Sequence, residues 1–442
     1  MNILLSTNSR LKSYASSVIP MNWSAAPRVF FGRSRGNSNL FSYDHGSSAG
    51  TVGKKPMRDI DVIAILGGGP AGAMAATTLA AAGRRVVLVD EKLVWEKPCG
   101  GGVTQKALSR YTFLRDAEVE SNWVQGCELI SPAGSKAYLR MERQIAIFSR
   151  RVLNGLLLQR AQQAGTELLR DRVTGIDGCP GQWQLRTCNA NLSADYLILA
   201  LGVKSAFRDR FSRPFTSTDL MAAVGYFVPG TDDHMQVRFL PGLEGYIWIF
   251  PRRDHCSAGI CARMGTKSTK ELRLSLEQYL RQQGVHFQGA PFFAHLLPSL
   301  SWHTLREARF SGEGWAMIGD AAGFVEPITG EGVYYALRSA ELLCQALLAG
   351  RPEMYPLLLR EDFLPELELA AGMTNWFFTG RVLGQAITEC LVQLAAQSRE
   401  FRELVCALFA SGQYRKLLPS LLELFCAQTG ATRPPLAAEV VQ

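Results

Sequence analysis

One glycine-rich segment constrains the fold of this chain more than any other feature. It spans residues 61–72 and reads DVIAILGGGPAG, an apolar run followed by closely spaced glycines. This pattern predicts a buried strand, a tight turn and the start of a helix. Gly67 suits the turn, Gly69 lets a pyrophosphate approach the backbone, and Gly72 lets the helix pack against the strand. The residues expected to bind a dinucleotide here are Gly67, Gly69, Pro70, Ala71 and Gly72.

An acidic residue follows at the position expected for such a site. A second apolar stretch, residues 85–89, ends at Asp90. In dinucleotide-binding units, an acid about 20 residues after the glycine turn accepts hydrogen bonds from the ribose hydroxyls of the adenosine. We assign this role to Asp90 and include the adjacent Glu91 in the cofactor site. A glycine-rich turn in an unrelated α/β unit would explain the turn but not the acid.

A later segment changes the expected ligand from any dinucleotide to a flavin. Residues 316–332 read AMIGDAAGFVEPITGEG and precede a helical pattern at 333–348. Asp320 ends a short apolar strand, where its carboxylate reaches a ribityl hydroxyl, while free N–H groups at the helix start face the pyrimidine edge. A strand-end carboxylate also serves as a helix cap, so Asp320 is informative only together with the first motif. The cofactor residues expected here are Gly319, Asp320, Pro327, Gly330 and Gly332.

Two further motifs narrow the resemblance to one family. Residues 97–102 read KPCGGG and residues 245–251 read GYIWIFP. With the glycine-rich segments they resemble the geranylgeranyl reductase family of flavoproteins, within the hydroxylase-like FAD-binding superfamily that also includes monooxygenases and halogenases. The similarity runs from about residue 59 to the end and weakens after about 350, although residues 411–418 resemble the family's C-terminal segment. The resemblance implies an α/β fold, with a Rossmann-type FAD-binding domain, an inserted antiparallel β-sheet substrate domain and a helical C-terminal region.

The expected domain boundaries follow these motifs. Residues 1–58 are rich in Ser, Asn, Gly and Arg and carry seven of the eight net positive charges, which favours a disordered basic extension. Alternating polar and apolar residues between 208 and 300 indicate the antiparallel sheet. The remaining expected parts are 59–207 for the first part of the FAD-binding domain with inserted short strands at about 105–150, 208–300 for the substrate domain, 301–350 for the second part of the FAD-binding domain, and 351–442 for the helical region.

Composition excludes several classes of function. Outside the extension the net charge is close to zero, so we expect no nucleic-acid partner. Ten cysteines lack metal-ligand spacing, which favours a reducing cytoplasm and no metal site. No apolar run is long enough to span a bilayer, so any membrane contact is expected to be peripheral. For residues 1–58 we favour a disordered extension over an organelle-targeting peptide. Met57 is a credible initiator, in which case the residues before it would be translated upstream sequence.

One departure from the superfamily pattern bears on the electron donor. Residues 199–205 read LALGVKS, with Leu201 where the superfamily usually carries the Asp of an Asp-Gly pair. In the aromatic hydroxylases that Asp is associated with cofactor and pyridine-nucleotide handling. Its absence argues against hydroxylase-style use of NADPH. The expected donor therefore stays open between NADPH and a ferredoxin-like protein.

Candidate residues for chemistry lie around the family motifs. The resemblance places Arg150 at a helix start facing the cofactor, although a solvated arginine fits the sequence nearly as well. Cys99 is a candidate proton donor or thiolate, with inert packing as the alternative. Alternate aromatic residues predict a prenyl-binding wall or an ordinary aromatic core. The residues of this wall are Tyr246, Trp248, Phe250 and Pro251. We expect Cys99 and this strand on opposite sides of one apolar cavity at the flavin.

Three functions fit these motifs. We favour an FAD-dependent oxidoreductase that reduces carbon–carbon double bonds of a geranylgeranyl-type polyprenyl lipid or an isoprenoid quinone. A flavin-dependent monooxygenase or halogenase is the first alternative, because residues 246–251 only partly resemble the halogenase WxWxIP segment. A flavin redox sensor without turnover is the second.

Overall fold

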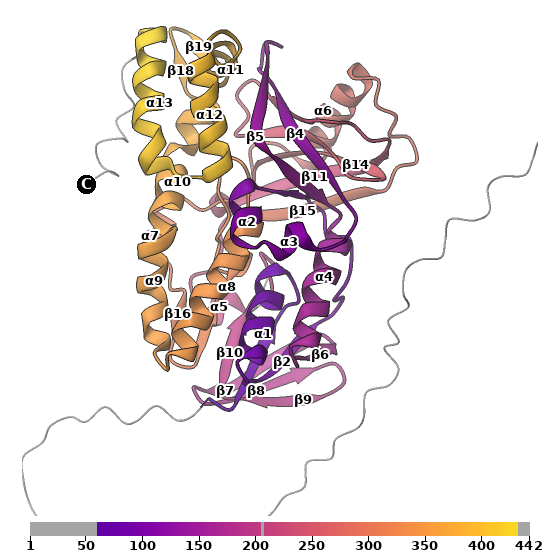
Figure 1. Ribbon diagram of the computed structural model, residues 1–442, viewed down its shortest axis with the longest axis vertical. Helices are drawn as coiled ribbons and strands as arrows, with labels where there is room; N and C mark the ends of the chain where they lie inside the picture. Colours follow the sequence, from indigo (N-terminus) through magenta and orange to yellow (C-terminus); the bar gives the residue numbers. More distant parts are fainter. Residues whose placement is uncertain (1–59, 205–206, 432–442) are drawn as a thin grey trace, which may run out of the picture. The chain divides into compact units, whose positions relative to one another are not determined.

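The computed structural model describes residues 60–204 and 207–431 (Figure 1). The described residues belong to one unit of the chain, which begins at Met57. The basic extension expected at 1–58 and the proposed start at Met57 lie outside them.

A six-stranded sheet forms the dinucleotide-binding half of the protein. Its strand order is β16-β17-β10-β1-β2-β6, and all neighbours are parallel except the edge pair β16 and β17. The central strands β1 and β10 are apolar and almost entirely buried, as parallel strands in the middle of a sheet usually are. The strands are β1 (Val62–Leu66), β2 (Arg85–Asp90), β6 (Glu167–Arg170), β10 (Tyr196–Leu199), β16 (Ser311–Gly312) and β17 (Trp315–Met317).

Three helices pack side by side in this half. Helix α1 (Pro70–Ala81) lies between α4 (Arg150–Gln163) and α8 (Val333–Leu348), as Figure 1 shows. Small residues on α1, including Ala73 and Ala76, are fully buried and allow this close approach. The helix expected at 333–348 is confirmed, and α4 begins at Arg150 as the sequence indicated.

An eight-stranded sheet forms the second layer. Its order is β15-β11-β14-β13-β12-β4-β5-β3, antiparallel except for the parallel pair β12 and β4. Helix α6 (Thr269–Gln282) packs on β11 and β14. The strands are β3 (Gly102–Val103), β4 (Ser121–Ile130), β5 (Lys136–Phe148), β11 (Leu220–Pro229), β12 (Met235–Phe239), β13 (Gly245–Pro251), β14 (His255–Arg263) and β15 (Phe292–Pro298).

Residues 105–150 contain strands, as expected, but these strands are long rather than short. This region begins with helices α2 (Gln105–Arg110) and α3 (Phe113–Asp116) and continues as two long paired strands, β4 and β5, of 10 and 13 residues. A register shift between Val124 and Gly126 interrupts the alternation that would have revealed one long hairpin. The parallel pairing of β4 with β12 then joins this hairpin to the strands of 208–300 in one sheet, so the two inserted regions form a single layer.

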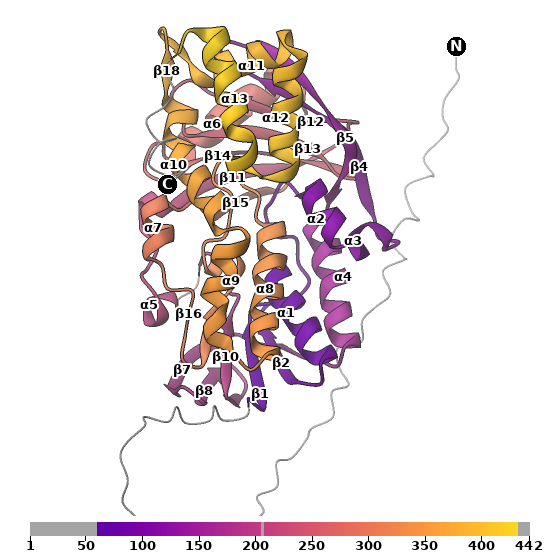
Figure 2. The same cartoon turned by 60° about the vertical axis from the view of Figure 1, so that its left-hand side comes forward.

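The C-terminal region is helical, as expected, apart from a small hairpin. Helices α11 and α12 pack on β5 and cover that end of the large sheet (Figure 2). The elements here are α9 (Tyr355–Asp362), α10 (Leu364–Thr379), β18 (Arg381–Val382), β19 (Gln385–Ala386), α11 (Ile387–Gln397), α12 (Arg399–Ser411) and α13 (Tyr414–Thr429).

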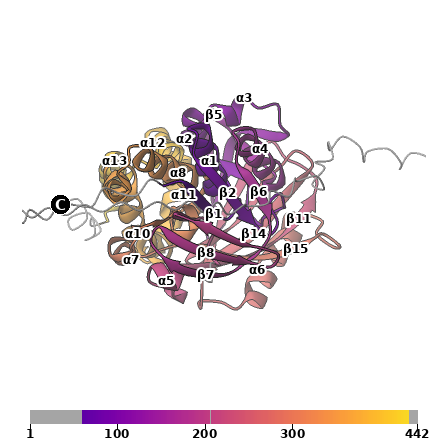
Figure 3. The same cartoon turned by 90° about the horizontal axis from the view of Figure 1, so that it is seen from below.

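The remaining elements lie away from the large sheet. A three-stranded sheet of β7 (Val173–Cys179), β8 (Gln182–Thr187) and β9 (Asn191–Ala194) is seen in front when the molecule is viewed from below (Figure 3). Short helices α5 (Arg208–Phe211) and α7 (Trp302–Glu307) complete the fold. Within residues 60–204 and 207–431, none of the helices combines the length and apolarity that crossing a bilayer requires.

Candidate functional site

A cavity of about 310 Å³ lies where the two sheets meet. One end is formed by the loops after β1, β10 and β17, that is, by the carboxyl ends of parallel strands, where ligands bind in open α/β sheets. The other end is apolar and is formed by the large sheet and the C-terminal helices. Its apolar lining residues are Cys127, Leu129, Met141, Ile145, Met235, Val237, Phe239, Phe377 and Phe409.

Most of the predicted cofactor residues lie at the first end of this cavity. Those in its lining are Gly69, Pro70, Ala71, Arg150, Asp320, Gly330 and Gly332. Asp90 lies behind them, and its carboxylate accepts the Gly68 N–H at 2.7 Å and the Lys92 N–H at 2.8 Å. Glu91 is exposed and Pro327 is buried outside the lining, so the structure brings neither to the cavity.

Two glycines of the first motif are required by the packing behind the turn. Gly67 has φ +110°, and a side chain there would collide with the Ala200 carbonyl. A side chain at Gly72 would collide with the carbonyl of Gly67 itself. By contrast, a methyl group at Gly69 would meet nothing within 4 Å and would project into open space. Gly67 and Gly72 therefore shape the turn, while Gly69 leaves room for a ligand.

Arg150 is a buried residue, so the alternative of a solvated arginine was wrong. Its side chain is 4% exposed and lines the cavity, and one terminal nitrogen donates to the Asn154 side chain at 3.2 Å. Its Nε has no hydrogen-bond partner among the described residues. An unpaired, buried N–H of a cation next to a lining of glycines suits a ligand with phosphate or carbonyl oxygens, as FAD has. The residues present therefore fit FAD.

Asp320 forms an ion pair that the sequence motifs did not reveal. Lys97 Nζ lies 2.9 Å from its Oδ2, and both side chains are about one-fifth exposed. Burial raises the pKa of Asp320, but Lys97 and Arg150 outweigh this effect and hold the pKa below its usual value. The carboxylate therefore stays ionised and can accept hydrogen bonds. Lys97 is the first residue of the KPCGGG motif, and this position was the only sign in the sequence that it belongs to the site.

Two more titratable lining residues were missed. Glu331 stands between Gly330 and Gly332, and the Thr104 hydroxyl donates to its Oε1 at 2.7 Å. Burial raises the pKa of Glu331 to about 7. His295 lines the cavity from β15, and burial, assisted by nearby cations, lowers its pKa to about 3. This imidazole is neutral, and its Nε2 has no partner in the described part of the chain.

The Cys99 loop and the aromatic strand line the cavity together, but they are neighbours in contact rather than opposite walls. The Cys99 carbonyl accepts the Ser257 hydroxyl at 2.9 Å, and the Trp248 indole donates to the same hydroxyl at 3.2 Å. A side chain at Gly100 would press on the Phe250 ring. The expectation of opposite sides was wrong because Gly100, which has no side chain, lets the loop pack directly on Phe250 of the strand.

The aromatic residues of β13 have distinct surroundings. Tyr246, Trp248 and Phe250 all line the cavity, whereas Pro251 is buried outside its lining. The Tyr246 hydroxyl donates to the Thr329 carbonyl, next to Gly330. This contact joins the large sheet to the loop that precedes α8, so the same strand borders both ends of the cavity.

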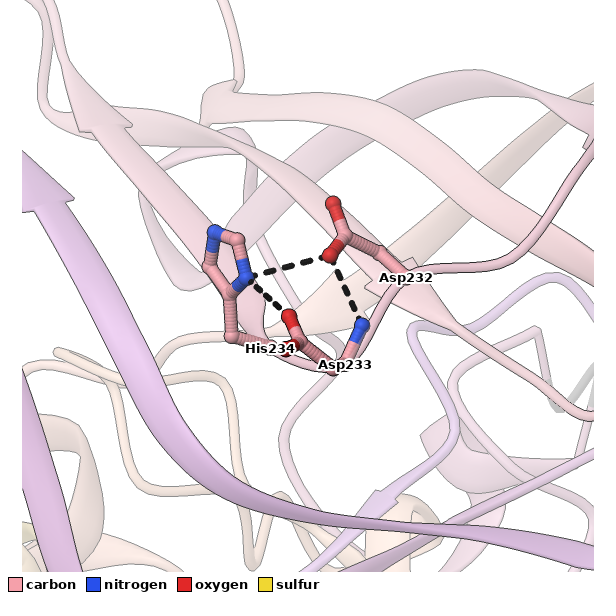
Figure 4. A group of neighbouring side chains, drawn as sticks. All are labelled: Asp232, Asp233 and His234. Carbon is pink, nitrogen blue, oxygen red and sulfur yellow. Dashed lines mark hydrogen bonds and ion pairs between the residues drawn. The ribbon is translucent and has the colours of Figure 1, made fainter.

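A cluster of two exposed acids and a partly exposed histidine lies outside the lining of this cavity. Asp232, Asp233 and His234 bring one ligand atom each within 4.8 Å of one another (Figure 4). His234 Nδ1 lies 3.1 Å from Asp232 and 2.7 Å from Asp233, so the imidazole already pairs with both carboxylates. Because exposed acids commonly gather without an ion, we assign no metal to this cluster.

Replacing Asp320 by alanine is expected to weaken FAD binding by about 10- to 100-fold, because a hydrogen bond to a charged group is lost and Lys97 is left unpaired. Fluorescence titration of the flavin-free protein with FAD measures the effect. Asp320→Asn keeps a hydrogen-bond acceptor, so its affinity for FAD is expected to lie between those of the wild-type protein and Asp320→Ala. Unchanged affinity in Asp320→Ala would remove this residue from the cofactor site.

Comparison with known proteins agrees with this geometry. A family model described as pyridine nucleotide-disulphide oxidoreductase matches residues 61–210. A geranylgeranyl diphosphate reductase from Synechocystis is 27% identical over 330 residues, which cover 65% of this chain and 75% of the relative. These sequence matches confirm FAD as the cofactor and the resemblance inferred from the motifs.

Solved structures confirm the fold. A protein from Thermoplasma acidophilum described as geranylgeranyl bacteriochlorophyll reductase-like has a TM-score of 0.68 at 21% identity, over 82% of this chain and 99% of that one. A flavin-dependent brominase has a TM-score of 0.62 at 16% identity, over 80% and 94% of the two chains. The fold is therefore shared by a protein described as reductase-like and by a flavin-dependent brominase. The chain is an FAD-dependent oxidoreductase related to the geranylgeranyl reductases.

Proposed function

We propose that this protein reduces carbon–carbon double bonds of a geranylgeranyl-type polyprenyl lipid. One observation carries the proposal: a single cavity connects the cofactor-binding turns to a long apolar lining. A polyprenyl chain is apolar and branched, and it gains free energy in proportion to the apolar area that it buries. The sequence relationship to geranylgeranyl diphosphate reductase supports the same substrate class.

The bound flavin would supply the hydride chemistry, and the chain's own residues would supply position, a proton and a dry site. Reduction of one isolated double bond needs a hydride at one carbon, which the reduced cofactor would supply, and a proton at the other, which the protein would supply. Trp248 and Phe250 present flat apolar faces that suit an extended prenyl chain. Phe377 and Phe409, from the C-terminal helices, exclude water from the far end.

We assign the proton to Cys99. Its side chain is partly exposed and lines the cavity, and its Sγ accepts the Gly101 N–H at 3.3 Å. The carbonyl of Cys99 is fixed by hydrogen bonds from the large sheet, so the loop has a defined position. A positioned proton donor typically contributes about 100- to 10,000-fold to a rate.

Anaerobic single turnover tests the proposal. The protein is reduced with dithionite, which bypasses the natural donor, and is then mixed with geranylgeranyl diphosphate in detergent. We expect the visible absorbance of oxidised flavin to return and the prenyl product to gain two hydrogens per reduced bond by mass spectrometry. In a second sample the reduced protein is mixed with oxygen instead of the lipid. Rapid reoxidation by oxygen, together with no prenyl product in the anaerobic assay, would favour the oxygenase, and slow reoxidation in both samples would favour the redox sensor. Repeating the assay with NADPH or a reduced ferredoxin in place of dithionite identifies the donor.

Two variants separate substrate use from cofactor binding. Cys99→Ser is expected to keep FAD and to lower the rate of prenyl reduction about 100-fold, because the proton donor is weakened. Trp248→Ala is expected to raise KM for the lipid more than Kd for FAD, because apolar contact with the chain is lost. Cys179→Ser, at an exposed position on β7, is the matched control for the thiol. Full reductase activity in both site variants would contradict the assignment.

A further inference from the structure

Arg252 is buried although it directly follows the aromatic strand β13 at the edge of the cavity. Its side chain is 1% exposed, whereas the side chain of the next residue, Arg253, is 64% exposed. A buried guanidinium is costly unless several partners satisfy it. Its partners therefore indicate what its burial accomplishes.

Two partners of Arg252 lie on the Cys99 loop, and a third, His255 Nε2 on β14, lies 3.2 Å from one terminal nitrogen. One terminal nitrogen lies 2.7 Å from Glu96 Oε1, and the other donates to the Cys99 carbonyl at 2.7 Å. The guanidinium also lies over the Phe227 ring, 4.9 Å from its centroid. Gly101 has φ +93°, and a side chain there would collide with the Phe148 carbonyl, so this glycine allows the turn that brings the loop beside Arg252.

Glu96 extends the same network to the cofactor end of the cavity. Its carboxylate accepts the Arg150 N–H at 2.9 Å and the Ser149 hydroxyl, so it caps the N-terminus of α4. Burial raises the pKa of Glu96, but Arg252 and these hydrogen bonds outweigh it and hold the pKa below its usual value. One ion pair therefore joins the end of β13, the Cys99 loop and the helix start that carries Arg150.

We propose that Arg252 is a positioning residue that, through Glu96 and the Cys99 carbonyl, fixes the Cys99 thiol relative to the cofactor and the aromatic wall. The inference rests on the proposed function in one respect, namely that Cys99 delivers the proton. A displacement of about 1 Å at a reacting group costs roughly 100-fold in rate. Losing Arg252 should thus lower kcat while leaving KM for the lipid nearly unchanged.

The test combines kinetics with the reactivity of Cys99 in flavin-loaded protein. Each cysteine is followed by mass spectrometry during alkylation with N-ethylmaleimide, and exposed Cys179 serves as the internal reference. In Arg252→Gln we expect Cys99 to react about tenfold faster because its loop is released, with Cys179 unchanged. We expect kcat to fall about 100-fold in the same variant.

Two further variants keep the proposal falsifiable if Arg252→Gln folds poorly. Arg252→Lys keeps the charge but loses the two-pronged contact and is expected to lie between wild type and Arg252→Gln in both measurements. Glu96→Gln removes the other partner and is expected to accelerate Cys99 alkylation as well. Arg253→Gln, one position away and exposed, is the matched control and is expected to behave as wild type in both.

The outcomes separate this inference from the proposed function. Wild-type kcat and wild-type Cys99 alkylation in folded Arg252→Lys and Glu96→Gln would overturn the positioning role and leave reductase activity standing. Faster alkylation in these variants without prenyl reduction by the wild-type protein would support the positioning of the loop and overturn the proposed reaction. A uniform loss of melting temperature, with unchanged alkylation ratio and unchanged kcat, would make Arg252 a structural residue only.

Discussion

Replacing Gly72 by valine should yield a protein without bound FAD and with a large loss of stability. The new side chain would collide with the Gly67 carbonyl, which is backbone and has no rotamer to move to. The turn and the start of α1 must then separate, at an expected cost of about 3–5 kcal/mol in the free energy of unfolding. Chemical denaturation measures this loss, and the visible absorbance per mole of protein measures the flavin content.

Gly69→Ala is the matched control for this prediction. A methyl group at Gly69 meets no protein atom within 4 Å, so the stability of the flavin-free protein should be close to that of wild type. The same methyl group projects into the space assigned to the pyrophosphate and should weaken FAD binding about tenfold or more. If Gly72→Val retained wild-type flavin content, the turn would not be the cofactor site.

The free energy of unfolding of the wild-type protein should fall as the pH rises, and Glu331→Gln should remove most of this fall. Burial raises the native pKa of this carboxyl to about 7, above its unfolded value of about 4.5. The folded state therefore holds this proton more tightly than the unfolded state does. Its contribution to stability is fully present below about pH 4.5 and is lost as the pH rises through 7, by ~3 kcal/mol in all.

Urea unfolding at about pH 5 and about pH 9 measures this effect. Wild type should lose stability between the two, and Glu331→Gln should lose about 3 kcal/mol less, because glutamine keeps an acceptor for Thr104 without a titrating proton. Glu313→Gln, in the exposed turn between β16 and β17, is the control for removing a surface carboxylate. Parallel pH profiles for wild type and Glu331→Gln would contradict the raised pKa.

The cofactor-binding half could be predicted from the sequence because its signals are local. The turn at Gly67, the acid at Asp90 and the helix at 333–348 each follow from neighbouring residues. The surroundings of Lys97, Glu331 and His295 depend instead on chain segments that are far apart in sequence. Burial and paired charges set their properties, and neither is visible in a short window.

Arg252 shows where the sequence held an unused signal. Tyr246, Trp248, Phe250 and Arg252 occupy alternate positions, so a strand extended by one residue places the arginine on the aromatic face. Two adjacent arginines suggest a solvated turn, and that interpretation conceals the alternation. No local sequence pattern indicated that regions 105–150 and 208–300 form one sheet. The pairing of β4 with β12 that joins them links residues over 100 positions apart.

The pairing of β4 with β12 also dictates an order of events during synthesis. Cys127 and its neighbours leave the ribosome well before Met235, their partner, so an apolar hairpin has an unpaired edge for that interval. Phe377 and Phe409, which close the far end of the cavity, are made later still. The apolar wall of the cavity is thus open to water, and to other nascent chains, until translation has passed residue 409.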